Sequence, residues 1–103
     1  MSHHPSRDAR MVIGALQLKL AIFESTSLKD KRRVVSSLKQ RLSDRYNASV
    51  AEIGSLDHRQ QAELGIAVVA NEPRFVESCL DKIVDYVRMD RSAALVSYET
   101  EVF

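Results

Sequence analysis

Residues 12–46 read VIGALQLKLAIFESTSLKDKRRVVSSLKQRLSDRY, and two different periodicities meet within this stretch. In residues 12–23 larger apolar side chains alternate with small or polar ones, which is the period of a half-buried strand. From residue 28 to about residue 46 the apolar residues recur at seven-, three- and four-residue steps, as in an amphipathic helix. Ser27 precedes the helix as an expected cap, and Asn47 is its expected stop. The stretch therefore predicts a strand followed directly by a long helix.

The rest of the chain continues with strands and a second helix. Further strand patterns occupy residues 49–53, about 62–70 and about 94–103. The polar residues 54–61 are the expected tip of a hairpin. Asn71 is the expected cap of the second helix, with Pro73 in its first turn. The apolar half of that helix carries Phe75, Val76, Cys79, Leu80, Ile83, Val84 and Val87.

Six elements in the order β-α-β-β-α-β predict the α+β class, because two helices can cover only one face of a four-stranded sheet. We expect a ferredoxin-like split βαβ sandwich over residues 11–103 and a flexible N-terminal extension over residues 1–10. Right-handed crossovers predict strand order four-one-three-two in an antiparallel sheet, with the central pair as the one parallel exception. The open face should carry Ala15, Gln17, Lys19, Ala21, Gly65, Ala67, Glu99 and Glu101.

Composition and motifs indicate the cellular compartment of the protein and the kinds of site it can have. The single cysteine, Cys79, cannot form an intrachain disulfide, and we expect it to be a buried hydrophobe. No signal peptide is recognisable, and no apolar run reaches the length of a membrane span. These features predict a cytoplasmic protein that does not enter a membrane. The sequence also has no glycine-rich phosphate loop, no Cys-x-x-Cys pair and no metal-ligand spacing, so we expect no cofactor and no metal.

Charge is distributed unevenly along the chain. Residues 28–45 contain seven basic and two acidic residues, whereas residues 46–103 contain five basic and ten acidic residues. Four cations, Lys29, Lys31, Arg32 and Arg33, crowd the start of the first helix, where the helix dipole already disfavours positive charge. An anionic ligand such as phosphate would offset that cost. The alternative is a solvated cluster, or one paired with acids of the same molecule; Glu52 is a carboxylate that needs such a cation.

Two histidine-containing segments invite catalytic or metal interpretations. Asp57 and His58 stand in the predicted hairpin tip, where an acid–base role would require a nucleophile that the sequence does not identify. His3 and His4 lack further ligands nearby in the sequence. We therefore expect a polar hairpin tip and no metal site. The open face also lacks central aromatic residues, which argues against the base stacking of RNA-recognition motifs.

Three segments resemble the YlxP-like family, a bacterial domain of unknown function (DUF503). They are residues 27–32 (SLKDKR), 49–52 (SVAE) and 62–67 (AELGIA). The resemblance covers about residues 11–103 and implies a ferredoxin-like fold and a cytoplasmic bacterial protein without an established activity. Members are often encoded near translation-initiation and ribosome-maturation genes, which suggests RNA or the ribosome as a partner by analogy. Asp57 and Gln60 match the family pattern, whereas the tryptophan expected before that glutamine is Arg59 here.

Three functions remain open. The first is a small binding protein, expected to be a homodimer, that meets RNA or the ribosome through its basic helix start and is not an enzyme. Its phosphate contacts would be Lys29, Lys31, Arg32 and Arg33, with Arg59 and Gln60 secondary. The second is a self-associating structural module that uses the open face and the last strand. The third is an enzyme or small-ligand domain at the 57–61 loop.

Overall fold

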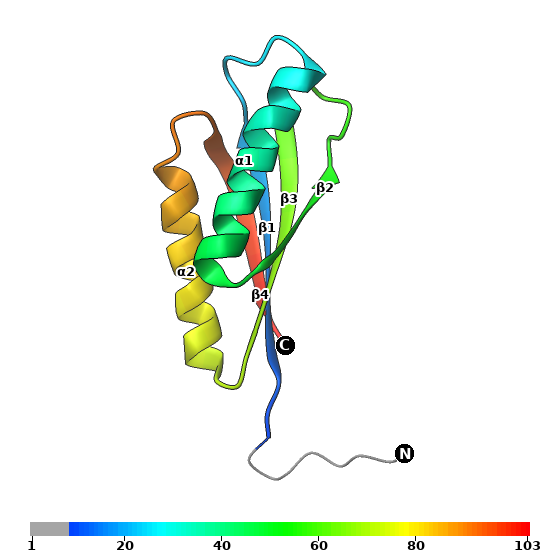
Figure 1. Ribbon diagram of the computed structural model, residues 1–103. Helices are drawn as coiled ribbons and strands as arrows, with labels where there is room; N and C mark the ends of the chain where they lie inside the picture. Colours follow the sequence, from blue (N-terminus) through cyan, green and yellow to red (C-terminus); the bar gives the residue numbers. More distant parts are fainter. Residues whose placement is uncertain (1–8) are drawn as a thin grey trace.

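The structure is a computed structural model that describes residues 9–103, and its elements follow the predicted order (Figure 1). The helices and strands are β1 (Val12–Ala21), α1 (Leu28–Tyr46), β2 (Ser49–Gly54), β3 (Gln61–Ala70), α2 (Pro73–Arg88) and β4 (Ala94–Val102). The α+β ferredoxin-like fold class is confirmed. Residues 1–8 of the expected extension, which include His3 and His4, lie outside the described residues.

The four strands form one sheet in the order β2-β3-β1-β4, which is the predicted order. The prediction of a parallel central pair is wrong, because β1 and β3 are antiparallel, as are the other two pairs. The reason lies in the crossovers. Helix α1 returns the chain so that β1 and β2 run in the same direction. Strand β3 lies between them and runs opposite to both. The parallel strands are therefore not neighbours.

Both helices pack on the same face of the sheet (Figure 1). The core between the layers is formed by alternate residues of β1 and β3, among them Leu16, Leu18 and Leu64, and by the apolar stripes of α1 and α2. On the opposite face, Gln17 is paired with Gly65 and with Glu99, so these three residues share the open face, as predicted. That face also exposes large apolar side chains of β2 and β3, namely Ile53 and Val69.

The ends of α1 match the capping prediction. The Ser27 hydroxyl accepts a hydrogen bond from the Asp30 amide at 3.1 Å, and Asn47 adopts the left-handed conformation with φ 48°. For α2, however, the predicted cap is wrong: Glu72 holds that position and makes no side-chain cap bond. The reason is Pro73, which holds the preceding residue extended, as an N-cap must be.

Phe75 is also placed differently from the prediction, because its side chain is 66% exposed rather than buried. On the wheel of α2 it lies about 120° from the centre of the core stripe around Val76 and Val87. The Phe75 side chain therefore lies on the flank of α2, where only α1 could cover it. Tyr46, the last residue of α1, contacts α2 near Lys82, two turns further on, so the first turn of α2 has no helix beside it.

None of the helices within residues 9–103 has the length and hydropathy needed to cross a membrane.

Close contact between α2 and β1 depends on Gly14. A Cβ atom at this position would collide with Val76 and approach Leu80 and Val68 to 3.1 Å. We expect Gly14→Ala to lower the free energy of unfolding by about 1–3 kcal/mol, because the core is already filled. Urea denaturation measures this change in the free energy of unfolding. The control is Gly65→Ala, whose Cβ would meet the exposed Ile53 side chain, which can move aside. Equal losses for the two variants would contradict the tight packing.

Candidate functional site

The start of α1 is fixed by a buried lysine. Lys31 has a side-chain exposure of 0%, and its ammonium lies 2.8 Å from the Glu52 carboxylate of β2. It also donates to the backbone carbonyl oxygens of Ser55 at 2.9 Å and Leu56 at 3.2 Å, and more weakly to that of Gln61 at 3.4 Å. One cation thus ties α1 to β2 and to the turn that connects β2 with β3.

This geometry corrects one predicted phosphate contact. Lys31 cannot reach an external anion, because its ammonium is enclosed and its donors are used within the molecule. The expectation that Glu52 pairs with a cation of the first helix is confirmed, and Lys31 is that cation. The helical pattern places Lys31 in the apolar stripe, and the side chain follows the stripe inward instead of emerging beyond the sheet edge.

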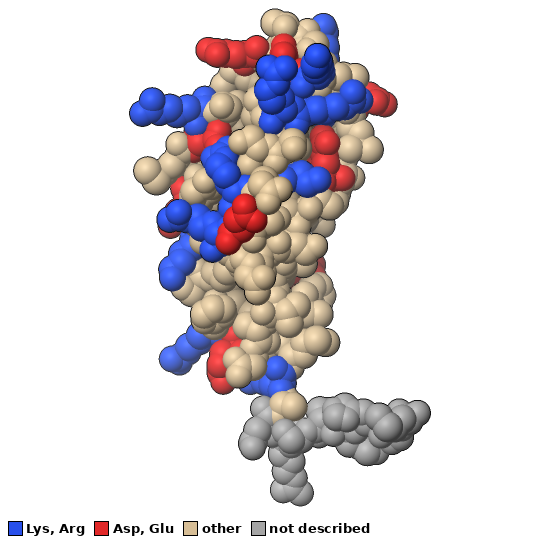
Figure 2. All heavy atoms as spheres, viewed as in Figure 1, with Lys and Arg blue, Asp and Glu red and all other residues tan. Residues whose placement is uncertain are grey.

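Lys29, Arg32 and Arg33 are exposed on α1, outside its buried stripe. They are related by steps of three and four residues, so their side chains are neighbours on the helix surface. Within residues 9–103 the ion pairs are Lys31–Glu52 and Arg41–Asp90, so none of these three cations has a carboxylate within 4 Å. Figure 2 shows lysine and arginine side chains gathered over α1 on this face of the molecule.

The nearest acid in sequence, Asp30, is held by the loop before α1. Its carboxylate accepts hydrogen bonds from the Thr26 hydroxyl at 2.9 Å and from the Thr26 amide at 3.3 Å. These two bonds are the main reason that the pKa of Asp30 is lowered, and the charge of Arg33 contributes less. Asp30 therefore stays ionised at neutral pH while serving the loop, and it forms no ion pair with the neighbouring cations.

Arg59 and Gln60, the two secondary predicted contacts, come to the same end of the molecule. The Arg59 guanidinium donates to the Thr26 carbonyl oxygen at 3.5 Å, and the side-chain amide of Gln60 donates to the Ser25 carbonyl oxygen at 3.3 Å. The hairpin tip thus lies against the loop that leads into α1. We name the exposed cations Lys29, Arg32, Arg33 and Arg59 the basic end.

The Asp57–His58 segment forms part of a turn. The side chains of residues 56–60 are all exposed, and His58 Nδ1 accepts a hydrogen bond from the backbone N–H of Gln60 at 3.1 Å. This geometry favours a turn-forming role for His58 and gives no support to an acid–base site. Among residues 9–103, no group of three or more His, Cys, Asp and Glu side chains is arranged to hold a metal ion. His3 and His4 lie outside this range.

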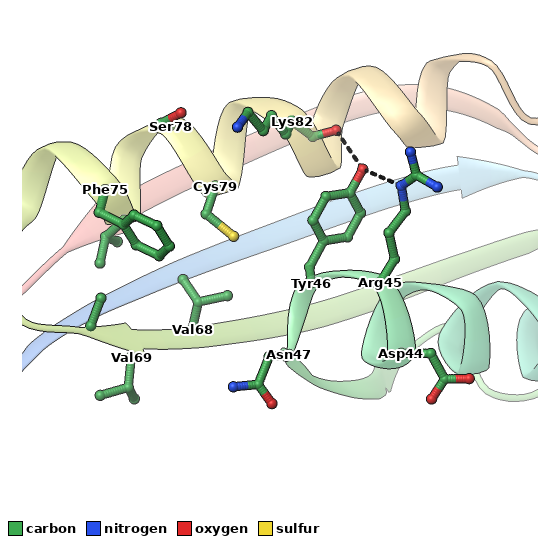
Figure 3. A pocket seen from close by; sticks show the side chains of 12 residues that line it. Asp44, Arg45, Tyr46, Asn47, Val68, Val69, Phe75, Ser78, Cys79 and Lys82 are labelled. Carbon is green, nitrogen blue, oxygen red and sulfur yellow. Dashed lines mark hydrogen bonds between the residues drawn. The ribbon is translucent and has the colours of Figure 1, made fainter.

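Sequence reasoning missed a second feature, a cavity at the other end of α1 (Figure 3). It lies beside Phe75 and Cys79 of α2 and Tyr46 of α1. The available signal was Phe75, an aromatic residue at the margin of its helical stripe. Only the position at which α1 ends shows that this ring is left uncovered.

The buried lysine yields a stability prediction. Lys31→Met keeps the length of the side chain but leaves Glu52 and the carbonyl oxygens of Ser55 and Leu56 without their donor. We expect a loss of about 3–5 kcal/mol in unfolding free energy, the usual cost of removing one partner of a buried pair. Lys29→Met is the matched control and should change stability by less than about 0.5 kcal/mol, because Lys29 is exposed. Chemical denaturation that finds similar values for both would refute the role given to Lys31.

Comparisons with known proteins identify the family. The model of a family described as "Protein of unknown function (DUF503)" matches residues 13–100. The "Uncharacterized protein YlxP" of Bacillus subtilis (strain 168) is 30% identical over 76 residues, which cover 74% of this chain and 83% of that protein. An amidase of the hydantoinase/carbamoylase family from Burkholderia phymatum superposes with a TM-score of 0.53 and 13% identity. The match covers 91% of this chain but 28% of the amidase, and it shows the fold alone. The chain belongs to the DUF503 family.

Proposed function

We propose that this protein is a small cytoplasmic binding protein, not an enzyme, that contacts structured RNA, such as that of the ribosome, through its basic end. The observation that carries the proposal is that Lys29, Arg32 and Arg33 are exposed and have no carboxylate within 4 Å among residues 9–103. Arg59 adds a fourth cation through its contact with Thr26.

The energetics of α1 support an anionic partner. Cations near a helix N-terminus oppose the helix dipole, at a cost of about 0.3–1 kcal/mol each. Like charges three or four residues apart add about 0.2–0.5 kcal/mol per pair. Lys29, Arg32 and Arg33 incur both costs, and the nearby carboxylate of Asp30 is engaged by Thr26. Phosphate groups at this position would offset both terms.

The shape of the surface favours a polyanion over a small anion. The cations project from the exposed side of a helix and from a neighbouring hairpin tip, so they do not converge into a pocket. Regularly spaced phosphates along an RNA strand can meet several such side chains at once, whereas a single phosphate cannot. The resemblance to a family encoded near ribosome-maturation genes points in the same direction by analogy.

Salt dependence tests this proposal. We expect the affinity for an RNA hairpin, and for purified small ribosomal subunits, to fall steeply as salt rises, because bound phosphates release counterions. Lys29→Gln/Arg32→Gln/Arg33→Gln should reduce the slope of log K against log salt by about 2–3, roughly one unit per lost phosphate contact. Fluorescence anisotropy with labelled RNA measures this slope.

The matched control removes three exposed cations elsewhere, in Arg74→Gln/Arg88→Gln/Arg91→Gln. It changes the net charge equally, so its salt slope should stay close to that of the unmodified protein. RNA binding that is absent at low salt, or that both triple variants reduce alike, would refute the proposed interface.

A second candidate function, self-association, is favoured by the free edge of β4. Ile13 and Phe103 exchange both backbone hydrogen bonds, at 3.1 and 2.8 Å. Such pairs alternate along an antiparallel ladder, so in this register Tyr98 and Thr100 direct their amide and carbonyl groups away from β1. A nine-residue edge strand with outward donors and acceptors can pair with the same strand of a second copy.

Light scattering over a concentration series tests whether the β4 strands of two copies pair. If β4 pairs between copies, the mass should rise to that of a dimer, and Thr100→Pro should restore the monomer because it removes an outward donor. The same donor plays no part in the pairing with β1, so the fold should persist by circular dichroism. Thr100→Ala is the control and should still dimerise. A protein that is monomeric at all concentrations would exclude this candidate.

A further inference from the structure

A cavity of about 490 Å³ lies where α1 ends, between α2 and β3 (Figure 3). This volume is within the range of about 300–1,000 Å³ that is typical of small-molecule sites. Among the residues that line it are Tyr46, Val68, Phe75, Val76, Cys79 and Lys82. None of the four cations of the basic end lines the cavity, so this site is separate from the proposed RNA interface.

The walls of the cavity are apolar and include an exposed aromatic ring. Val68 and Val76 are buried at its floor, and the Phe75 ring stands at one side with 66% of its surface exposed. Figure 3 shows the Tyr46 ring on the opposite side, with the Cys79 thiol directed into the space between the two rings. An apolar body that enters between these rings would remove from water the phenyl surface that the fold leaves uncovered.

One wall is held in place before any ligand arrives. The Tyr46 hydroxyl donates to the Lys82 carbonyl oxygen at 3.4 Å and accepts from Arg45 Nε at 3.2 Å. Its ring also meets the Tyr86 ring edge-on, with centroids 5.9 Å apart. These contacts join the end of α1 to the middle of α2, so the cavity is largely preformed.

The charge at the rim is positive. Lys82 lines the cavity and has no carboxylate within 4 Å in the part of the chain from residue 9 onward. The guanidinium of Arg45 lies over the Tyr86 and Tyr46 rings, 5.2 and 5.8 Å from their centroids, so it is already engaged. The lining acid, Asp44, accepts two hydrogen bonds from the Gln40 amide at 3.0 and 3.1 Å, and its side chain points away from the cavity (Figure 3). Lys82 is therefore the available cation at an apolar cavity whose acid is engaged elsewhere.

We propose that this cavity binds a small carboxylate with an apolar body, which lies between Phe75 and Tyr46 while its carboxylate meets Lys82. Apolar walls select the body, and Lys82 selects the anion, because hydrogen bonds to charged groups are the stronger ones. Binding is non-covalent. Burial raises the pKa of the Cys79 thiol, so the reactive thiolate is a minor form at neutral pH, and no covalent step is assigned to Cys79.

The test compares 4-phenylbutyrate with 4-phenylbutanol, two probes that share the apolar body and end in a carboxylate or in a neutral hydroxyl, by titration of the ¹⁵N-labelled full chain. We expect saturable shifts of the amide signals of Tyr46, Val68 and Cys79, with the carboxylate bound at least about tenfold more tightly than the alcohol. Lys82→Gln should remove most of that difference, by about fivefold to tenfold, without weakening the alcohol. Phe75→Ala should weaken both probes. Both residues are exposed, so these variants should fold.

Lys39→Gln, a charge change on α1 away from the cavity, is the control and should leave both affinities unchanged. Alkylation of Cys79 by iodoacetamide gives an independent measurement and should slow when 4-phenylbutyrate is saturating. Equal affinity for the two probes, an equal effect of Lys82→Gln and Lys39→Gln, or the absence of saturable shifts at millimolar probe would each overturn the proposal. None of these outcomes bears on RNA binding at the basic end.

Discussion

The buried ammonium of Lys31 is the interaction on which the arrangement of this molecule depends. A lysine without a partner in a protein interior would cost several kcal/mol, so it persists there only with compensating contacts. The Glu52 carboxylate neutralises it at 2.8 Å, and the carbonyl oxygens of Ser55 and Leu56 accept its other hydrogens. These partners belong to β2 and to the turn after it, so the same contacts that keep the charge buried also fix the first turn of α1 against the hairpin.

This attachment explains how α1 can begin with a run of cations. Neighbouring positive charges at a helix N-terminus weaken that end of the helix. Here Lys31 holds the turn from the inside, and Asp30 binds Thr26 in the loop before it. Lys29, Arg32 and Arg33 are then left on the outer side with no structural task. The division follows the helical period, since of these four cations only Lys31 lies on the buried stripe of α1.

Local sequence patterns predicted the elements and most of the caps, because these depend on periodicity and on residues next to one another. They failed where a distant segment decides the outcome. The pattern placed Lys31 in the apolar stripe, but its burial depends on Glu52 being brought opposite by the β2–β3 register. Phe75 lies on the flank of its helical wheel, where α1 could cover it, yet it is exposed because α1 ends at Tyr46. The contact of Arg59 with Thr26 joins two loops that no local pattern relates.

The two proposed sites lie at opposite ends of α1, and this separation makes them independent. The helix has 19 residues and is therefore about 28 Å long at 1.5 Å per residue. Screening in physiological salt reduces electrostatic interactions over about 8 Å, so an anion at one end has little effect on the other. Coupling between the sites would have to pass through movement of α1 itself. Lys31 holds the helix at its first turn and Tyr46 holds it at its last residue, and these two attachments oppose such movement.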